Sequence, residues 1–231
     1  MELKVYVHRL SQPARAVLLL CKSAGIEFEE VFIDLTTKQQ KTPEFLEINP
    51  LGQVPAISHG DFNLYESHAI LIYLASAFPG VADHWYPSDL QKRAKVHAVL
   101  DWHHSNLRRG SVLFSLNTTL GPVFGFPVSE EGAAEGEKLL SSSLSTIESV
   151  FLNDNGSFLL GADKPSIADL SLVCEILQFE TLKEEDRKRI MEPHKKVQKW
   201  VDDVKNATKA HFDDIHETLY GFCAMLKQKS A

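Results

Sequence analysis

The sequence predicts a two-part protein, with an α/β part followed by an all-helical part. Strand and helix signals alternate only in the first third of the 231 residues, and every later periodic segment is helical. A short stretch from Pro79 to Pro87 between the two regions has the composition of a linker. Hydrophobic residues make up 44% of the chain, which is enough for two modest cores. We therefore predict an α/β domain at residues 1–77, a linker at 78–88 and a helical domain at 89–231.

Four segments of the first third are predicted to be β-strands. Residues 3–7 alternate between apolar and polar side chains, and residues 30–34 form a second strand-like segment. Residues 54–58 and 62–65 lie on either side of a short turn at 59–61. We expect these last two strands to form an antiparallel hairpin.

Three helices are predicted to connect these strands. Pro13 suits the first turn of a helix and Gly25 suits the position just past its end, with apolar residues at helical spacing between them. A short helix begins at Thr42-Pro43-Glu44 and ends at 49–52, and a third helix spans 67–77. The resulting order, βαβ-α-ββα, is a thioredoxin-like arrangement with a right-handed crossover.

The second part is predicted to be helical throughout. Residues 89 to about 116 should form one long helix, and 121–127, with two glycines and two prolines, should form a loop. Residues 140–151 place apolar side chains on one helical face, and 212–226 do the same in the last helix. The segment Ser166-Ile167-Ala168-Asp169 has the pattern of a capping box that opens another helix.

Composition excludes several classes of protein. The net charge is −7, and the 24 Lys and Arg residues are scattered and outnumbered by 31 acids, so we expect no nucleic-acid partner. The apolar runs are too short to span a bilayer, so we expect no membrane partner. Cys21, Cys174 and Cys223 lie far apart without a Cys-x-x-Cys motif, which disfavours a disulfide framework, a zinc site or a dithiol redox motif.

The same features predict a cytoplasmic protein. Three scattered cysteines fit a reducing compartment. The first residues, Met1-Glu2-Leu3-Lys4, lack the pattern of a signal peptide, and the last three, Lys229-Ser230-Ala231, are not a peroxisomal Ser-Lys-Leu address.

One cluster of motifs points to an anion site. A helix that opens on Glu66-Ser67 offers unpaired N–H groups and a positive dipole end to an anion. The proline turn Val54-Pro55-Ala56 leaves neighbouring backbone free to bind something else. We expect these features to form a pocket for a small peptide-like anion. Ser11 lies at another helix start, where its hydroxyl either points at the bound anion or caps the helix. No Gly-x-Ser-x-Gly elbow surrounds it, so a hydrolytic nucleophile is disfavoured.

These motifs resemble those of cytosolic glutathione S-transferases, and the match extends over essentially the whole chain. Four motifs occur in the family's order: Ser11-Gln12-Pro13-x-Arg15, Asn49-Pro50-Leu51-Gly52-x-Val54-Pro55-Ala56, Glu66-Ser67-x-Ala69-Ile70 and Ser166-Ile167-Ala168-Asp169-Leu170. The serine in its Ser-Gln-Pro context, with Trp85-Tyr86-Pro87 and Leu107-Arg108-Arg109 downstream, is similar to the theta class. The stretch 84–110 most resembles plant theta enzymes.

The resemblance implies roles in glutathione binding for several residues of the α/β part. Ser11, with Gln12 beside it, would bind glutathione and donate a hydrogen bond to its sulfur. The backbone of Val54, before a cis Pro55, would pair with the cysteinyl part. The γ-glutamyl end would be held by Glu66 and Ser67.

The glycyl carboxylate would face three further residues: Gln40, Lys41 and Gln53. Theta-like relatives often carry His near Gln40 and Lys at Gln53, whereas glutamine supplies donors without charge. We therefore expect a weaker glutathione affinity, with Lys41 as the remaining cation.

A serine hydroxyl at a helix start can activate a thiol without a general base or metal. Lowering a thiol pKa from about 8.5 to about 6.5 requires about 2.7 kcal/mol. A hydrogen bond to a charged group contributes roughly 1.5–3 kcal/mol, and a helix N-terminus roughly 0.3–1 kcal/mol. The two together are sufficient, so we expect no metal.

Three residues of the helical part are candidates for the electrophile site: Arg108, His104 and Phe114. Arg108 would polarise a leaving group, although Phe114 is also a natural core residue. Arg15 is expected to anchor its helix rather than to touch substrate. His103 and His104 are adjacent on a predicted helix and should face different ways, which favours packing over metal binding.

The resulting prediction is a homodimeric, detoxifying glutathione S-transferase. The glutathione thiolate would attack an electrophilic carbon or the oxygen of an organic hydroperoxide, which is a peroxidase activity. A non-catalytic carrier of glutathione or hydrophobic ligands remains an alternative, because Gln40 and Gln53 lack charge. A thiol transferase or dehydroascorbate reductase is a further alternative, but it needs a cysteine where Ser11 stands, and Cys21 falls in mid-helix.

Overall fold

The computed structural model describes residues 2–152 and 155–230; Met1 and Ala231, which bound the predicted domains, lie outside these ranges. The first part contains four strands in one sheet, in the order β2-β1-β3-β4. The strands are β1 Leu3–Val7, β2 Glu29–Phe32, β3 Ala56–His59 and β4 Phe62–Tyr65. β1 runs parallel to β2 and antiparallel to β3, and β3 runs antiparallel to β4. The predicted hairpin is therefore present.

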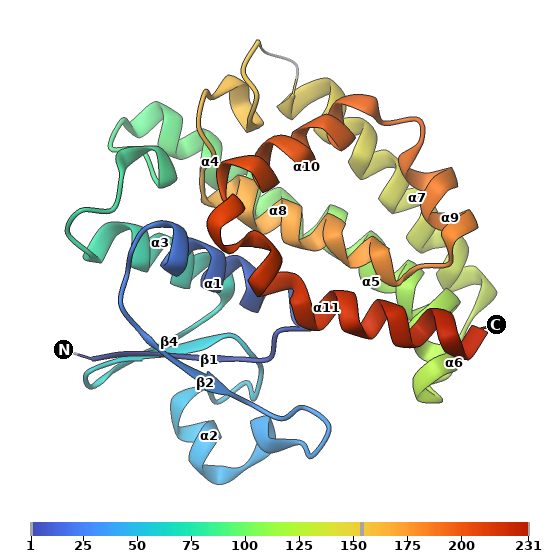
Figure 1. Ribbon diagram of the computed structural model, residues 1–231, viewed down its shortest axis with the longest axis horizontal. Helices are drawn as coiled ribbons and strands as arrows, with labels where there is room; N and C mark the ends of the chain where they lie inside the picture. The colour runs from blue at the N-terminus through green and yellow to red at the C-terminus, as the bar shows by residue number, and fades with distance from the viewer. Residues whose placement is uncertain (1, 153–154, 231) are drawn as a thin grey trace.

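Helices cover both faces of this sheet. Helices α1 (Gln12–Ser23) and α3 (Ser67–Ala77) pack together on the face toward the helical part, and α2 (Pro43–Ile48) lies on the opposite face (Figure 1). A small second core of Ile33, Phe45 and Ala56 lies under α2. The element order βαβ-α-ββα confirms the predicted thioredoxin-like fold.

The bounds of two strands, β2 and β3, differ from the prediction, and the two larger differences have local reasons. β2 ends at Phe32 because Asp34 accepts hydrogen bonds from the backbone and hydroxyl of Thr36 and turns the chain. β3 begins at Ala56 rather than at residue 54, because Pro55 has no N–H to donate to the ladder.

The second part is helical, as predicted. Its α-helices are α4 Leu90–His103, α5 Arg109–Ser115, α6 Gly121–Phe124, α7 Glu130–Thr146, α8 Ile167–Leu177, α9 Glu184–Met191, α10 Lys195–Ala207 and α11 Lys209–Ser230. Three π-helical turns extend or join them: His104–Arg108, Leu116–Leu120 and Ile147–Phe151. Short 3-10 turns lie at Gln39–Lys41, Asp83–Trp85, Leu159–Gly161 and Gln178–Thr181.

The long helix predicted from residue 89 continues further than expected. It runs from α4 through two π turns to α6, so the loop prediction was wrong for its first four residues, Gly121–Phe124. Pro122 lies in the first turn of α6, directly after the π turn Leu116–Leu120, where the regular α-helical hydrogen-bond pattern is already interrupted. The helix ends at Gly125, whose φ of 71° suits glycine.

The two parts share one hydrophobic core. Helix α1 packs against α3 on one side and against α8 and α11 on the other. Trp200 of α10 and Phe212 of α11 are among the largest buried side chains of this core. No helix within the described ranges is long and apolar enough to cross a membrane.

Asp169 connects the start of α8 to its surroundings. Its carboxylate is fully buried and accepts hydrogen bonds from the Ser166 backbone N–H at 2.8 Å and hydroxyl at 2.9 Å, which completes the predicted capping box. It also accepts from the Leu159 backbone at 2.9 Å and from Trp200 Nε1 at 2.8 Å. One side chain therefore holds a loop, a helix start and α10 together.

We expect Asp169→Ala to lower the free energy of unfolding by about 3–5 kcal/mol, because it leaves several buried donors without an acceptor. Chemical denaturation followed by circular dichroism measures the loss. Asp89→Ala is the matched control, since Asp89 caps the exposed start of α4 and its loss should cost only about 1 kcal/mol. Equal costs for the two variants would contradict the central role of Asp169.

Candidate active site

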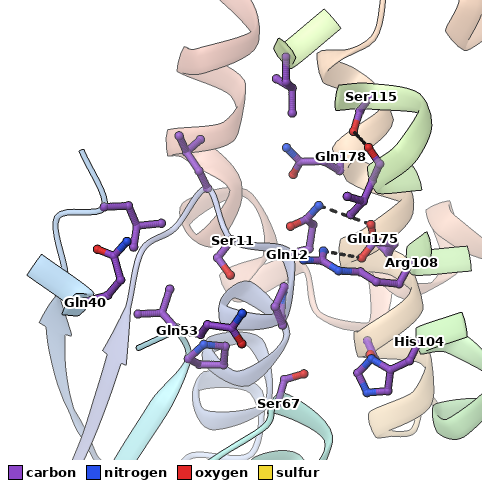
Figure 2. A pocket seen from close by; sticks show the side chains of 18 of the residues that line it. Ser11, Gln12, Gln40, Gln53, Ser67, His104, Arg108, Ser115, Glu175 and Gln178 are labelled. Carbon is purple, nitrogen blue, oxygen red and sulfur yellow. Dashed lines mark hydrogen bonds and ion pairs between the residues drawn. The ribbon is translucent and has the colours of Figure 1, made fainter. Parts of the chain in front are cut away.

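A cavity of about 620 Å³ lies between the sheet domain and the helical part. One wall carries Ser11, Gln12, Gln40, Gln53, Glu66 and Ser67, and the other carries His104, Arg108, Ser115, Glu175 and Gln178 (Figure 2). The cavity therefore collects polar groups from segments up to 167 residues apart, and neither part of the chain forms it alone.

Ser11 occupies the N-cap position of α1 at the edge of the cavity. Its backbone accepts a hydrogen bond from Arg15 N at 3.0 Å, but within the described residues its hydroxyl makes no capping bond. The sequence left two interpretations open for this hydroxyl, capping the helix or pointing at a bound anion, and the hydroxyl does not cap the helix. The hydroxyl is available to a group in the cavity, beside the positive end of α1.

Arg15 anchors the loop that precedes Ser11. Its guanidinium is fully buried and donates to the carbonyls of Arg9 and Leu10, both at 3.0 Å. It also donates to the Cys174 carbonyl at 3.1 Å and to Gln178 Oε1 at 3.0 Å on the helical side. This geometry agrees with the expected anchoring role of Arg15. The guanidinium connects the loop before Ser11 to α8 and to the turn that follows α8.

The loop before β3 brings Gln40 and Gln53 to the cavity. Buried Asn49 donates to the Gln53 carbonyl at 2.7 Å and accepts from Leu51 N at 3.0 Å, which shapes the loop. Gly52 has a φ of 58°, and a Cβ there would lie 2.7 Å from the Gln40 carbonyl, so only glycine fits. Lys41 donates to the Leu51 carbonyl at 3.1 Å and is not among the described residues that line the cavity.

The remaining glutathione-site candidates lie at the cis bond and at the start of α3. The Val54–Pro55 peptide is cis, and both residues line the cavity. Glu66 has a φ of 69°, an uncommon conformation for a residue with a side chain, and holds the N-cap position of α3. Ser67 follows at the first helical position and is 7% exposed. Within the described chain the Glu66 side chain makes no capping bond, so its carboxylate is available.

A buried carboxylate organises the opposite wall. Glu175 of α8 accepts from Arg108 Nη1 at 2.9 Å and from Gln12 Nε2 at 3.4 Å (Figure 2). Burial is the largest single effect and alone would raise the pKa of this carboxyl. The guanidinium of Arg108, together with His103 and Ser111, outweighs burial and lowers the pKa to about 2. Arg108 is thereby fixed at the cavity wall, and Gln12, next to Ser11, is tied to the helical part.

Three histidines meet beside this network. His68 of α3, His103 at the end of α4 and His104 at the start of a π turn have ring centroids 4.3–5.7 Å apart. His103 is buried and His104 is exposed, as expected of adjacent residues that face different ways, yet both rings lie close to His68. Burial and the two neighbouring imidazoles lower the pKa of His68 to about 3, so its ring is neutral.

The three cysteines lie away from this chemistry. Burial raises the pKa of Cys21 and Cys174 to about 12 and that of Cys223 to about 11. None of them is a described lining residue of the cavity. The thiols are therefore protonated and poorly placed to act as nucleophiles.

Comparisons with known sequences match both parts of the chain. The family model for the glutathione S-transferase N-terminal domain matches residues 1–76, and that for the C-terminal domain matches residues 125–210. The chain is 59% identical over 220 residues to glutathione S-transferase T1 of Arabidopsis thaliana, covering 95% of this chain and 90% of that protein. It is 54% identical to Arabidopsis glutathione S-transferase T3, again over 95% of this chain but only 37% of that longer protein.

Solved structures agree. A human theta-class glutathione transferase, in complex with the glutathione conjugate of 1-menaphthyl sulfate, superposes with a TM-score of 0.88 at 34% identity. The match covers all of this chain and 92% of the human one. The chain belongs to the theta class of the glutathione S-transferase family.

Most of the residues predicted for a glutathione S-transferase site come together in the cavity. Those that line it are Ser11, Gln12, Gln40, Gln53, Val54, Pro55, Glu66, Ser67, His104 and Arg108. Lys41 is not among the lining residues, and Phe114 is 2% exposed and belongs to the core.

Sequence reasoning missed Glu175, Ser171, Gln178 and His68. Glu175 had a usable signal, because it is an isolated charge in the apolar run from Leu170 to Phe179. His68 gave no signal of its own, since its partners lie 35 and 36 residues away.

We expect Arg15→Lys to lower the free energy of unfolding by about 2–4 kcal/mol, because an ammonium cannot reach all four acceptors of the planar guanidinium. Thermal and denaturant unfolding measure the loss. Arg109→Lys is the control: its pair with Glu135 is exposed, and its replacement should change stability by less than about 0.5 kcal/mol. Indistinguishable losses in the two variants would show that Arg15 is dispensable as an anchor.

Proposed function

We propose that this protein is a glutathione transferase in which Ser11 stabilises the glutathione thiolate. The observation that carries the proposal is the Ser11 hydroxyl, which faces the cavity without a capping partner among the described residues. Its hydrogen bond, added to the dipole of α1, supplies the roughly 2–3 kcal/mol that a thiol needs to ionise at neutral pH. The thiol proton leaves to solvent, and no side-chain base is required.

The polar wall of the sheet domain fits the rest of glutathione. The Val54 backbone suits the cysteinyl amide, and Glu66 with Ser67 suits the γ-glutamyl ammonium and carboxylate. Gln40 and Gln53 both line the cavity, and their side-chain amide N–H groups are the donors that a carboxylate accepts from. The glutamine pair Gln40 and Gln53 would bind the glycyl end by hydrogen bonds, with less charge than the resemblance led us to expect.

The helical wall fits a hydrophobic electrophile with a polar leaving group. Apolar side chains of α5, α6, α11 and the turn between the first two form one side: Val112, Leu116, Leu120, Phe124 and Phe222. Arg108, held by Glu175, offers its remaining donors to a departing anion. The human relative solved with a conjugate of 1-menaphthyl sulfate contains a ligand of this general chemistry.

The same thiolate supports a peroxidase activity, which we propose as a second reaction. Attack on a hydroperoxide oxygen forms a sulfur–oxygen bond and breaks the O–O bond, releasing the alcohol. A second glutathione thiol then forms the disulfide and releases water. A non-catalytic carrier would bind glutathione without turnover. A thiol transferase is disfavoured, because the buried cysteines have raised pKa values.

We also propose that the enzyme is a cytosolic homodimer with a role in detoxification. Phe62 of β4 is 46% exposed and its ring packs against that of Tyr73 of α3, which places an exposed aromatic side chain on the sheet domain. Exposed apolar patches commonly mark interaction sites. Sedimentation velocity measures the oligomeric state, and a monomer at micromolar concentration would contradict the dimer.

We expect Ser11→Ala to keep the fold and bind glutathione, while the pKa of bound glutathione returns toward about 8.5 and turnover falls by about 10- to 100-fold. A pH titration of thiolate ultraviolet absorbance measures the pKa, and conjugation and hydroperoxide assays measure turnover. Ser142→Ala, on the exposed surface of α7, is the control. An undepressed pKa in the wild type would favour the carrier instead.

We expect Glu66→Gln to raise KM for glutathione by about 10-fold or more with little change in kcat, because a charge-assisted hydrogen bond to the γ-glutamyl ammonium is lost. Steady-state kinetics at varied glutathione separate the two constants. Asp61→Asn removes a nearby exposed acid from the hairpin turn and should leave both constants unchanged. An unaltered KM in Glu66→Gln would remove Glu66 from the glutathione site.

A further inference from the structure

The three-histidine cluster is built from two elements that meet at the cavity wall. His68 is the second residue of α3, and His103 and His104 lie where α4 passes into a π turn. One ring nitrogen from each lies within 4.8 Å of the other two. The proposed transferase chemistry uses neither His68 nor His103, so the cluster calls for a separate explanation.

The spacing of the donor atoms suits a metal ion. His68 Nε2 and His103 Nδ1 are 3.2 Å apart. Two imidazole ligands of a tetrahedral zinc ion, each bound at about 2.0–2.1 Å, are separated by about 3.4 Å. His104 is exposed at the cavity wall, and one of its ring nitrogens lies within 4.8 Å of the other two donor atoms.

The surroundings of His103 are those of an oriented metal ligand. Its Nε2 is buried and has no hydrogen-bond partner among the described residues, yet it lies 3.6 Å from Glu175 Oε2. If Nδ1 binds a metal, the N–H on Nε2 points at this carboxylate, which is the carboxylate–histidine–metal arrangement of many metal sites. Ser171 Oγ is hydrogen-bonded to His68 Nε2 at 2.8 Å, and a metal ion on this nitrogen would replace that hydrogen bond.

Two acidic groups and one guanidinium lie near the exposed side of the cluster. Glu66 and Asp101 both act on His104 electrostatically, and Glu175 faces His103. Arg108 opposes a cation here, but Glu175 pairs with it at 2.9 Å. With imidazole nitrogens as donors and no described thiolate, the donor set suits Zn²⁺, Cu²⁺ or Ni²⁺ rather than Mg²⁺ or Ca²⁺.

We propose that His68, His103 and His104 form a binding site for a divalent transition-metal ion such as Zn²⁺, with the fourth coordination position open to the cavity. The site is independent of the assignment of Ser11, because none of its ligands activates the thiol. Its geometry of three protein ligands and an open position is that of metal sites that bind water or a substrate oxygen.

The test is calorimetric titration of the untagged, metal-free full-length protein with ZnCl₂, in buffer without glutathione, whose thiol would itself bind the ion. We expect one ion per chain in the wild type. His104→Ala should weaken binding by about 10- to 100-fold or more, and so should His68→Gln. His211→Ala, which removes a histidine of α11 outside the cavity lining, should bind as the wild type does.

Cobalt substitution identifies the ligands. Co²⁺ bound to the wild type should give visible d–d bands without the near-ultraviolet charge-transfer band of a thiolate ligand, because the thiols are buried and protonated. His104 is exposed, so its alanine variant should fold even if His68→Gln does not. Absence of saturable zinc binding, unchanged affinity in His104→Ala, or a thiolate charge-transfer band would each overturn the proposal.

Discussion

The buried guanidinium of Arg15 is the interaction on which the site depends. A charge removed from water is costly unless hydrogen bonds compensate for it. Here Nη1 and Nη2 donate to acceptors from both parts of the chain, while the buried Nε has no partner among the described residues. The loop carbonyls before Ser11 and the groups on α8 and after it therefore converge on one side chain. Ser11 is positioned by the packing of two domains rather than by its own helix alone.

The cavity also contains little free positive charge. Arg108 is neutralised by Glu175, Lys41 donates to a backbone carbonyl outside the described lining, and Gln40 and Gln53 are uncharged. The remaining attraction for anions comes from the N-termini of α1 and α3, which Ser11 and Ser67 occupy. Binding in this cavity thus depends on directed hydrogen bonds and dipoles, which act only at short range.

The parts of this structure that sequence could predict are those set by local periodicity. Strand alternation, the Pro13 and Gly25 signals and the capping box at Ser166 each depend on neighbours within a few residues, and the structure confirms the elements they predicted. Glu175 and His68 were missed because their meaning depends on partners many residues away. The helical conformation of residues 121–124 was missed because the sequence gives no periodic signal for the preceding π turn. That turn interrupts the α-helical hydrogen-bond pattern and so accommodates Pro122.

The π turns also explain how one continuous helix can shape a pocket wall. His104 and Arg108 are the first and last residues of one π turn, Leu116 and Leu120 are those of the next, and all four line the cavity. A π turn accommodates an extra residue and so shifts every following side chain around the helix axis. The form of the electrophile side therefore follows from two local departures from α-helical geometry, which the tight packing of α5 against α7 holds in place.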